Sequence, residues 1–198
     1  MTTIVSSSSQ NYAVMLADQG ITSDLMHPDM GKVVQQGTWL IGVCGEDRVC
    51  DVLQYTVTYP KVPQILIGKP IEKWYPWVVK QVVPKIANAV DHGLHKSYRG
   101  TLGDSEVLLV THGHTFLIGE TLGVSKGEPY WAVGSGSHLA MGAMSTAFKT
   151  NPDWDSQHSE FAYEAIKTAQ IHDPYTRGKV TGYKSLPTGQ IQALSYED

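Results

Sequence analysis

Short apolar runs separated by turn residues dominate the first part of the chain. The runs are Thr3-Ile4-Val5, Tyr12–Leu16, Lys32–Gln36 and Trp39–Val43. Runs of this length that are bounded by glycine, asparagine or serine are typical of buried β-strands. The pattern therefore predicts strands, and not helices, along the first part of the sequence.

A helical period replaces the short runs in the next part of the chain. Apolar residues recur at intervals of three and four between Glu46 and Tyr59 and again between Val78 and Leu94, which predicts two helices. Pro84 falls inside the second and is expected to kink or interrupt it. The stretch 60–77 between them is rich in proline and tryptophan, and we interpret it as an ordered excursion or a surface insertion.

The second half repeats this alternation of strands and helices. Strands are predicted at Glu106–Thr111, Thr115–Glu120 and Tyr130–Val133, helices at Ser137–Phe148 and Ser159–His172, and a terminal hairpin at Lys179–Leu186 and Gln190–Tyr196. The order of strands, two helices, strands, two helices and strands predicts an α+β fold, with two sheets packed together and helix pairs outside. A length of 198 residues predicts one domain, 1–198.

Composition and charge exclude several classes of protein. The 41% hydrophobic content is enough to fill a core, and the net charge of −4 argues against nucleic acid or anionic membrane as the main partner. No apolar run approaches the roughly 20 residues that span a bilayer, and the N-terminus lacks the pattern of a signal peptide. Two cysteines, Cys44 and Cys50, cannot form a disulfide framework, so we expect a reducing, cytoplasmic setting.

The first candidate for chemistry is Thr2. A small residue in this position allows Met1 to be removed, which would leave a threonine with a free α-amine. An α-amine has a pKa near 7.7–8.0, so it can act as a general base for its own hydroxyl at neutral pH. This is the N-terminal-threonine form of nucleophilic catalysis.

Later segments extend this candidate into a pattern. In chain order they are Ala17–Thr22, Lys32, Gly42–Gly45, Gly134–Ser137 and Ala165–Gly178. Together they resemble the proteasome β-subunit family of N-terminal-nucleophile hydrolases, and the start Met-Thr-Thr-Ile-Val is similar to that of the bacterial HslV-type peptidases. The resemblance covers about residues 2–48 and 106–182. It implies a four-layer α-β-β-α sandwich, with two antiparallel sheets between helix layers.

The resemblance also implies roles for individual residues. Thr2 would be the nucleophile, Lys32 would lower the pKa of its hydroxyl, Asp18 would keep Lys32 charged and oriented, and the N–H of Gly42 would form the oxyanion hole. Three further residues would hydrogen-bond around the N-terminal amine: Ser135, Asp173 and Thr176. Four would contact the substrate: Ile21 and Leu40 as walls of an apolar pocket, Thr22 and Cys44 through strand-like backbone pairing.

Each of these residues also has a simpler interpretation. Lys32 could be a solvated lysine at a strand end, Asp18 a turn residue, Gly42 a packing glycine and Ser135 a helix cap. The chain also departs from the family after Asp173. A proline, a tyrosine and an arginine (Pro174, Tyr175 and Arg177) stand where the family has small residues, so the loop nearest the amine is expected to have a different shape.

The expected function is that of a threonine-type endopeptidase acting on peptides or unfolded proteins, assembled as a ring-like homo-oligomer. The HslV-type relatives add an ATP-driven unfolding ring as a candidate partner. No cofactor is expected. No metal site is expected either, because the pair His112-Gly113-His114 lacks further ligands and is better interpreted as a hairpin turn. Two alternatives remain open: an N-terminal-nucleophile amidase acting on a small molecule, and a non-catalytic structural subunit.

Overall fold

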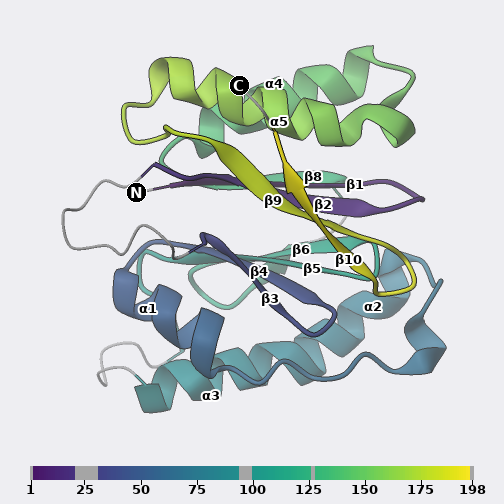
Figure 1. Ribbon diagram of the computed structural model, residues 1–198. Coiled ribbons are helices and arrows are strands. Elements are labelled where there is room, and N and C mark those ends of the chain that lie inside the picture. Colours follow the sequence, from purple (N-terminus) through teal and green to yellow (C-terminus); the bar gives the residue numbers. More distant parts are fainter. Residues whose placement is uncertain (1, 21–30, 94–99, 126–127, 197–198) are drawn as a thin grey trace.

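Two five-stranded antiparallel sheets lie face to face at the centre of the molecule (Figure 1). The computed structural model describes residues 2–20, 31–93, 100–125 and 128–196. The first sheet has the order β10-β9-β2-β1-β8 and the second the order β3-β4-β5-β6-β7. The strands of the first sheet are β1 (Thr3–Ser8), β2 (Ala13–Asp18), β8 (Tyr130–Gly134), β9 (Val180–Ser185) and β10 (Ile191–Ser195). Those of the second are β3 (Val33–Gln36), β4 (Trp39–Cys44), β5 (Glu106–Thr111), β6 (His114–Ile118) and β7 (Val124–Ser125).

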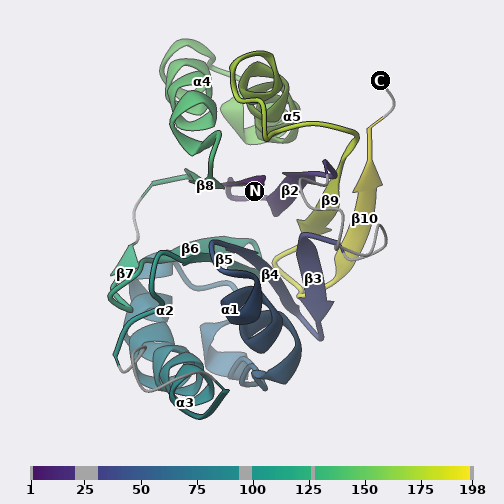
Figure 2. The same cartoon turned by 90° about the vertical axis from the view of Figure 1, so that its left-hand side faces the viewer.

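Helices cover the outer face of each sheet (Figure 2). The first sheet is covered by α4 (Ser137–Thr150) and α5 (Trp154–His172). The second is covered by α1 (Asp47–Asp51), α2 (Ile71–Trp77) and α3 (Val83–Gly93), together with the π-helical turns η1 (Val52–Thr56) and η3 (Val78–Val82) and the short 3₁₀ turn η2 (Gln64–Leu66). This arrangement confirms the predicted α+β sandwich with helix layers outside two antiparallel sheets.

Strand β4 shows how the sequence pattern builds the layers. Its side chains alternate: Trp39 and Ile41 pack against the helices, whereas Leu40 and Cys44 pack against the first sheet. Successive side chains of a strand point to opposite faces, so a strand covered on both sides has no polar face. This explains why the central strands read as continuous apolar runs.

The structure distinguishes the two interpretations of the stretch 60–77, which were an ordered excursion and a surface insertion. The stretch is ordered and contributes to the core, because Trp74 on α2 is fully buried and Trp77 stacks on Trp39 with ring centroids 6.1 Å apart. Helical structure runs on from Ile71 through Pro76, since packing of the buried Trp74 and the partly buried Trp77 offsets the loss of one helical hydrogen bond. The expected interruption at Pro84 is confirmed, because the chain forms a π-helical turn directly before α3.

Smaller differences concern the ends of elements. Helix α5 begins at Trp154 and not at Ser159, because Trp154 is itself a buried member of the core above the first sheet. The short strand β7 was not predicted. The turn at His112-Gly113 is confirmed as a tight hairpin, since both residues have positive φ, 47° and 79°. None of the helices in the described part of the chain is both long and apolar enough to cross a bilayer.

A buried histidine on the face of α5 that contacts β1 is expected to make stability depend on pH. The ring of His158 is fully buried, its Nδ1 lies 2.8 Å from Ser7 Oγ, and among the described residues its Nε2 has no hydrogen-bond partner. Burial, and secondarily the charge of Lys184, lowers the pKa of His158 from 6.5 to about 4. The unfolded chain therefore binds the proton more tightly, so stability is complete above pH 6.5 and is lost as the pH falls toward 4.

The expected loss from His158 is about 3 kcal/mol of unfolding free energy at pH 4 relative to pH 7. Chemical denaturation of the wild type and of His158→Phe at several pH values will measure it, because the variant should lose that part of the slope. His138→Gln, on the exposed surface of α4, is the matched control. Equal slopes for the wild type and His158→Phe would contradict the prediction.

Candidate active site

The buried carboxylate of Asp18, at the end of β2, collects five donors. Its Oδ1 accepts from Thr2 Oγ1 at 3.0 Å and from Thr3 N at 2.7 Å. Its Oδ2 accepts from Lys32 Nζ at 2.8 Å and from the backbone N–H groups of Gly20 and Arg177, each at 3.2 Å. Pairing of β1 with β2 places Ile4 opposite Ala17, which brings Thr2 and Thr3 to the carboxylate. Asp18 thus joins three separate segments of the chain.

Lys32 forms an ion pair with Asp18 in a largely buried setting. The Nζ–Oδ2 distance is 2.8 Å, the side chain of Lys32 is 14% exposed and that of Asp18 is 0% exposed. The ammonium also donates to the carbonyl of Gly20 at 2.8 Å. Burial lowers the pKa of Lys32, the charge and hydrogen bond of Asp18 oppose this shift, and the charge of Arg177 adds to it. The lysine is therefore held in one place and is easier to deprotonate than a surface lysine.

A second carboxylate, Asp173, organises the other side of the N-terminal segment. Its Oδ2 accepts from Ser135 Oγ at 2.6 Å and Thr176 Oγ1 at 2.5 Å, and its Oδ1 from Tyr175 N at 3.2 Å. Burial by itself would raise the pKa of Asp173, but these donors outweigh it and the pKa is lowered. Asp173 follows α5 directly, so the end of that helix sets its position. The structure thus brings Ser135, Asp173 and Thr176 together.

Thr3 connects the two carboxylate groups, although the sequence patterns did not point to it. Its Oγ1 lies 2.5 Å from Thr176 Oγ1 and accepts from Gly136 N at 3.0 Å, while its N–H donates to Asp18. A second threonine beside Thr2, at the start of an apolar strand, was the only available signal. A threonine is common in strands, so that signal could not separate a structural residue from a bridging one.

Glycine at the end of β8 allows the N-terminal strand to approach closely. Thr3 pairs with Gly134, and Ser135 N donates to the carbonyl of Thr2 at 3.0 Å. Gly134 has φ +99°, and a Cβ there would lie 1.8 Å from the Thr2 carbonyl oxygen. The turn Gly134–Ser137 therefore clamps the backbone of Thr2 as well as beginning helix α4.

The residues predicted to contact the substrate or the oxyanion do not gather at one place in the described structure. Gly42 lies inside β4, paired with Val33 and Leu108, and its Cα faces Ile4 and Met15 of the other sheet. Leu40 is fully buried between the sheets, a position that gives no support for a role in lining an open pocket. Ile21 and Thr22 lie outside the described residues.

Cys44 is buried in the same layer, at the end of β4. Burial raises the pKa of its thiol to about 12, although nearby backbone groups, among them those of Glu106 and Gly134, oppose the shift. A thiol with so high a pKa carries almost no thiolate at neutral pH and is a poor nucleophile. The structure therefore gives no support to Cys44 as a reacting group.

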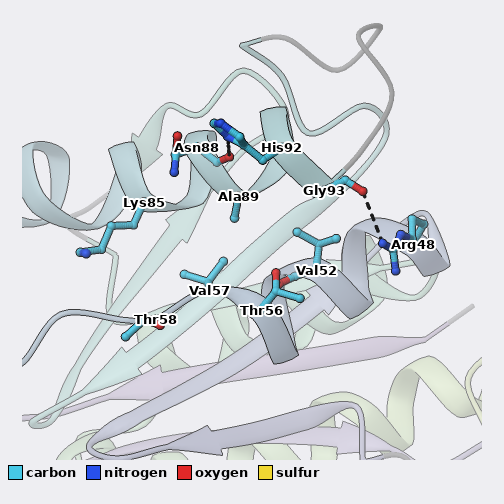
Figure 3. A pocket seen from close by; sticks show the side chains of 10 residues that line it. All are labelled: Arg48, Val52, Thr56, Val57, Thr58, Lys85, Asn88, Ala89, His92 and Gly93. Carbon is cyan, nitrogen blue, oxygen red and sulfur yellow. Dashed lines mark hydrogen bonds between the residues drawn. The ribbon is translucent and has the colours of Figure 1, made fainter.

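A surface hollow of about 430 Å³ lies away from these residues, between η1 and α3 (Figure 3). Val52, Val57 and Ala89 face one another across it, whereas Arg48 reaches toward the Gly93 carbonyl at one end. It contains none of the site residues expected from the sequence. In the described ranges, no group of three or more His, Cys, Asp or Glu side chains is placed to hold a metal ion.

Solved structures share this fold over almost the whole chain. The BPH protein of Thiobacillus denitrificans, in complex with epoxomicin, superimposes with a TM-score of 0.69 at 16% identity, covering 93% of this chain and 98% of that one. A second structure of the Thiobacillus denitrificans BPH protein gives a TM-score of 0.69 over 94% of this chain and 98% of that one, also at 16% identity. Eukaryotic HslV from Trypanosoma brucei gives 0.63 at 16% identity, covering 98% and 99%.

Comparisons of sequence add no closer relative. No family model matches the chain, and no curated protein matches it. At 16% identity the structural likeness establishes the fold, and it is the fold that the sequence resemblance implied. The roles of the individual site residues remain predictions.

Proposed function

We propose that this chain is a proteasome-like threonine peptidase whose nucleophile is the hydroxyl of Thr2 after removal of Met1. The observation that carries the proposal is the chain of contacts from Thr2 Oγ1 to Asp18 and from Asp18 to Lys32, at 3.0 and 2.8 Å. A nucleophile, a buried carboxylate and a buried cation within hydrogen-bond reach form the constellation that nucleophilic catalysis needs.

The proposed reaction has two stages. Thr2 Oγ attacks the peptide carbonyl carbon while its proton passes to the α-amine of Thr2, and the resulting tetrahedral intermediate expels the amine of the leaving peptide, which takes that proton. Water then attacks the ester that remains on Thr2 while the α-amine takes its proton. The ester bond to Thr2 Oγ breaks, this proton passes to Oγ, and the acid product leaves. Lys32 stabilises the developing negative charge and Asp18 holds Lys32. Gly42 lies inside β4 between β3 and β5, a position that gives no support to its N–H as the donor to the oxyanion.

The second carboxylate fits the same mechanism. Ser135, Asp173 and Thr176 fix the loop beside the N-terminal segment, and Asp173 stays ionised because its pKa is lowered. A negative charge there favours an oriented α-amine. The unusual residues Pro174 and Tyr175 do not prevent these contacts, since Tyr175 N itself donates to Asp173.

Assembly and partners follow from the same proposal. We take the active form to be a ring-like homo-oligomer in the cytoplasm that receives peptides or unfolded proteins, with an ATP-driven unfolding ring as a candidate partner. Size-exclusion chromatography with light scattering will measure the assembly. A monomer that hydrolyses peptides would contradict the ring but not the nucleophile.

Labelling of Thr2 tests the proposal directly. Epoxomicin, which the BPH structure contains, and a small β-lactone will be incubated with the full chain, and the N-terminal peptide will be mapped by mass spectrometry. In separate incubations, we expect Met1 to be absent and Thr2 to carry the adduct of whichever probe was added. Thr2→Ala should carry neither, whereas Thr146→Ala, on the exposed face of α4, should react like the wild type.

The two probes separate the alternatives. Reaction with the β-lactone but not with the peptide-like epoxomicin would favour an amidase for small molecules. Retention of Met1, or a free Thr2 that reacts with neither probe in the assembled protein, would reject catalysis and leave a structural subunit.

A further inference from the structure

Gly20 and Arg177 lie in direct contact where strands β2 and β9 end. The two strands pair antiparallel with Asp18 opposite Val180, and the pairing continues through Gln19 N, which donates to the carbonyl of Lys179 at 2.8 Å. One step further, a Cβ on Gly20 would lie 2.3 Å from Cγ of Arg177 and 2.5 Å from its carbonyl oxygen. The stem and the carbonyl group of Arg177 therefore both occupy the space in which any larger residue at position 20 would place its side chain.

The peptide groups of Gly20 also hold the Asp18–Lys32 pair on both sides. The N–H of Gly20 donates to Asp18 Oδ2 at 3.2 Å, and its carbonyl accepts from Lys32 Nζ at 2.8 Å. The N–H of Arg177 donates to the same carboxylate oxygen at 3.2 Å. A shift of Gly20 would therefore move the acceptor that orients the ammonium of Lys32.

The charge of Arg177 acts on the same lysine. It lowers the pKa of Lys32, in the same direction as burial and against the effect of Asp18. Asp18 and Arg177 are the charged groups that the described structure places around the Lys32 ammonium.

We infer that Arg177 is a positioning residue for the Thr2 site, which acts by packing on Gly20 and so fixing the carbonyl that holds Lys32. The positioning role of Arg177 rests on the proposed function of Thr2, whereas the contact between Gly20 and Arg177 is independent of that function. It gives a purpose to an arginine that stands where the family resemblance leads one to expect glycine. Arg177 acts through Gly20 and Lys32, so it needs no contact with the substrate.

Four variants separate the packing from the charge. Gly20→Ala introduces the clash, Arg177→Gly removes the stem, the double variant combines them, and Arg177→Met keeps the stem without the charge. The readout is the rate at which the β-lactone acylates Thr2, measured against pH, with Arg48→Met on the distant helix α1 as the matched control for loss of one charge. Midpoints of chemical denaturation are measured for the same set.

We expect Gly20→Ala to slow acylation about tenfold to a hundredfold and the double variant to recover part of that loss. Arg177→Met should acylate at a similar maximum rate, with its pH profile moved upward, because loss of a nearby cation raises the pKa of Lys32. Arg48→Met should leave the profile in place. Wild-type rates for Gly20→Ala would overturn the inference.

The denaturation midpoints test the contact between Gly20 and Arg177 independently of the proposed function. If the wild type itself does not react, the proposed function is rejected, and the midpoints still test the contact. Shifts for Gly20→Ala and Arg177→Gly that fail to add in the double variant would support the packing. Additive shifts would overturn it whether or not Thr2 reacts.

Discussion

Asp18→Asn is expected to slow acylation of Thr2 by on the order of a thousandfold and to lower the free energy of unfolding by about 3–5 kcal/mol. The carboxylate is fully buried and accepts five hydrogen bonds, one of them from the ammonium of Lys32. The amide of asparagine keeps the shape of the carboxylate, but its NH₂ group would face donors on one of the two oxygen positions and could not accept their hydrogen bonds. The substitution also removes the negative charge that pairs with Lys32. Both the position of Thr2 Oγ1 and the charge state of Lys32 should then be lost.

Labelling with the β-lactone and denaturation in urea will measure the two effects of Asp18→Asn separately. Asp104→Asn, at an exposed position, is the control for the same chemical change. A folded Asp18→Asn protein whose Thr2 still reacts at the wild-type rate would show that Asp18 has only a structural role. Unchanged stability would show that the buried charge of Lys32 finds another partner.

Gly134→Ala is the second change from which we expect a large effect. Gly134 has φ +99°, a conformation that alanine adopts only under strain, and the added Cβ would lie 1.8 Å from the carbonyl oxygen of Thr2. Strand β1 would have to move away from β8, which carries Thr2 away from Asp18. We expect a loss of more than about 3 kcal/mol in unfolding free energy and no detectable acylation of Thr2.

Gly142→Ala is the matched control for Gly134→Ala. It lies inside helix α4, and a Cβ added there would meet no atom within 4 Å outside its own helix backbone and chain neighbours. The same substitution should therefore stabilise the protein by about 0.5–1 kcal/mol. Thermal denaturation and labelling of both variants will check the pair. Wild-type labelling of a folded Gly134→Ala protein would mean that the strand tolerates the displacement.

The stretch 60–77 shows a feature of the structure that local sequence patterns did not predict. Its prolines indicated an excursion, because proline weakens both helices and strands. The structure instead buries Trp74 and stacks Trp77 on Trp39, and these contacts join segments far apart in the chain. The energy of such packing does not appear in any local pattern, so propensity alone left open whether this segment is an ordered excursion or a surface insertion.

The sequence by itself determined the type and order of most elements, because side-chain periods of two and of 3.6 residues follow directly from strand and helix geometry. Through the family resemblance it also indicated Thr2, Asp18 and Lys32. Only the tertiary structure decided how Thr3, Gly134 and the contact of Gly20 with Arg177 complete the site. Those contacts arise from the pairing of β1 with β8 and of β2 with β9, which joins residues more than a hundred positions apart. Register between such strands depends on the whole packed core, so no local run of residues encodes it.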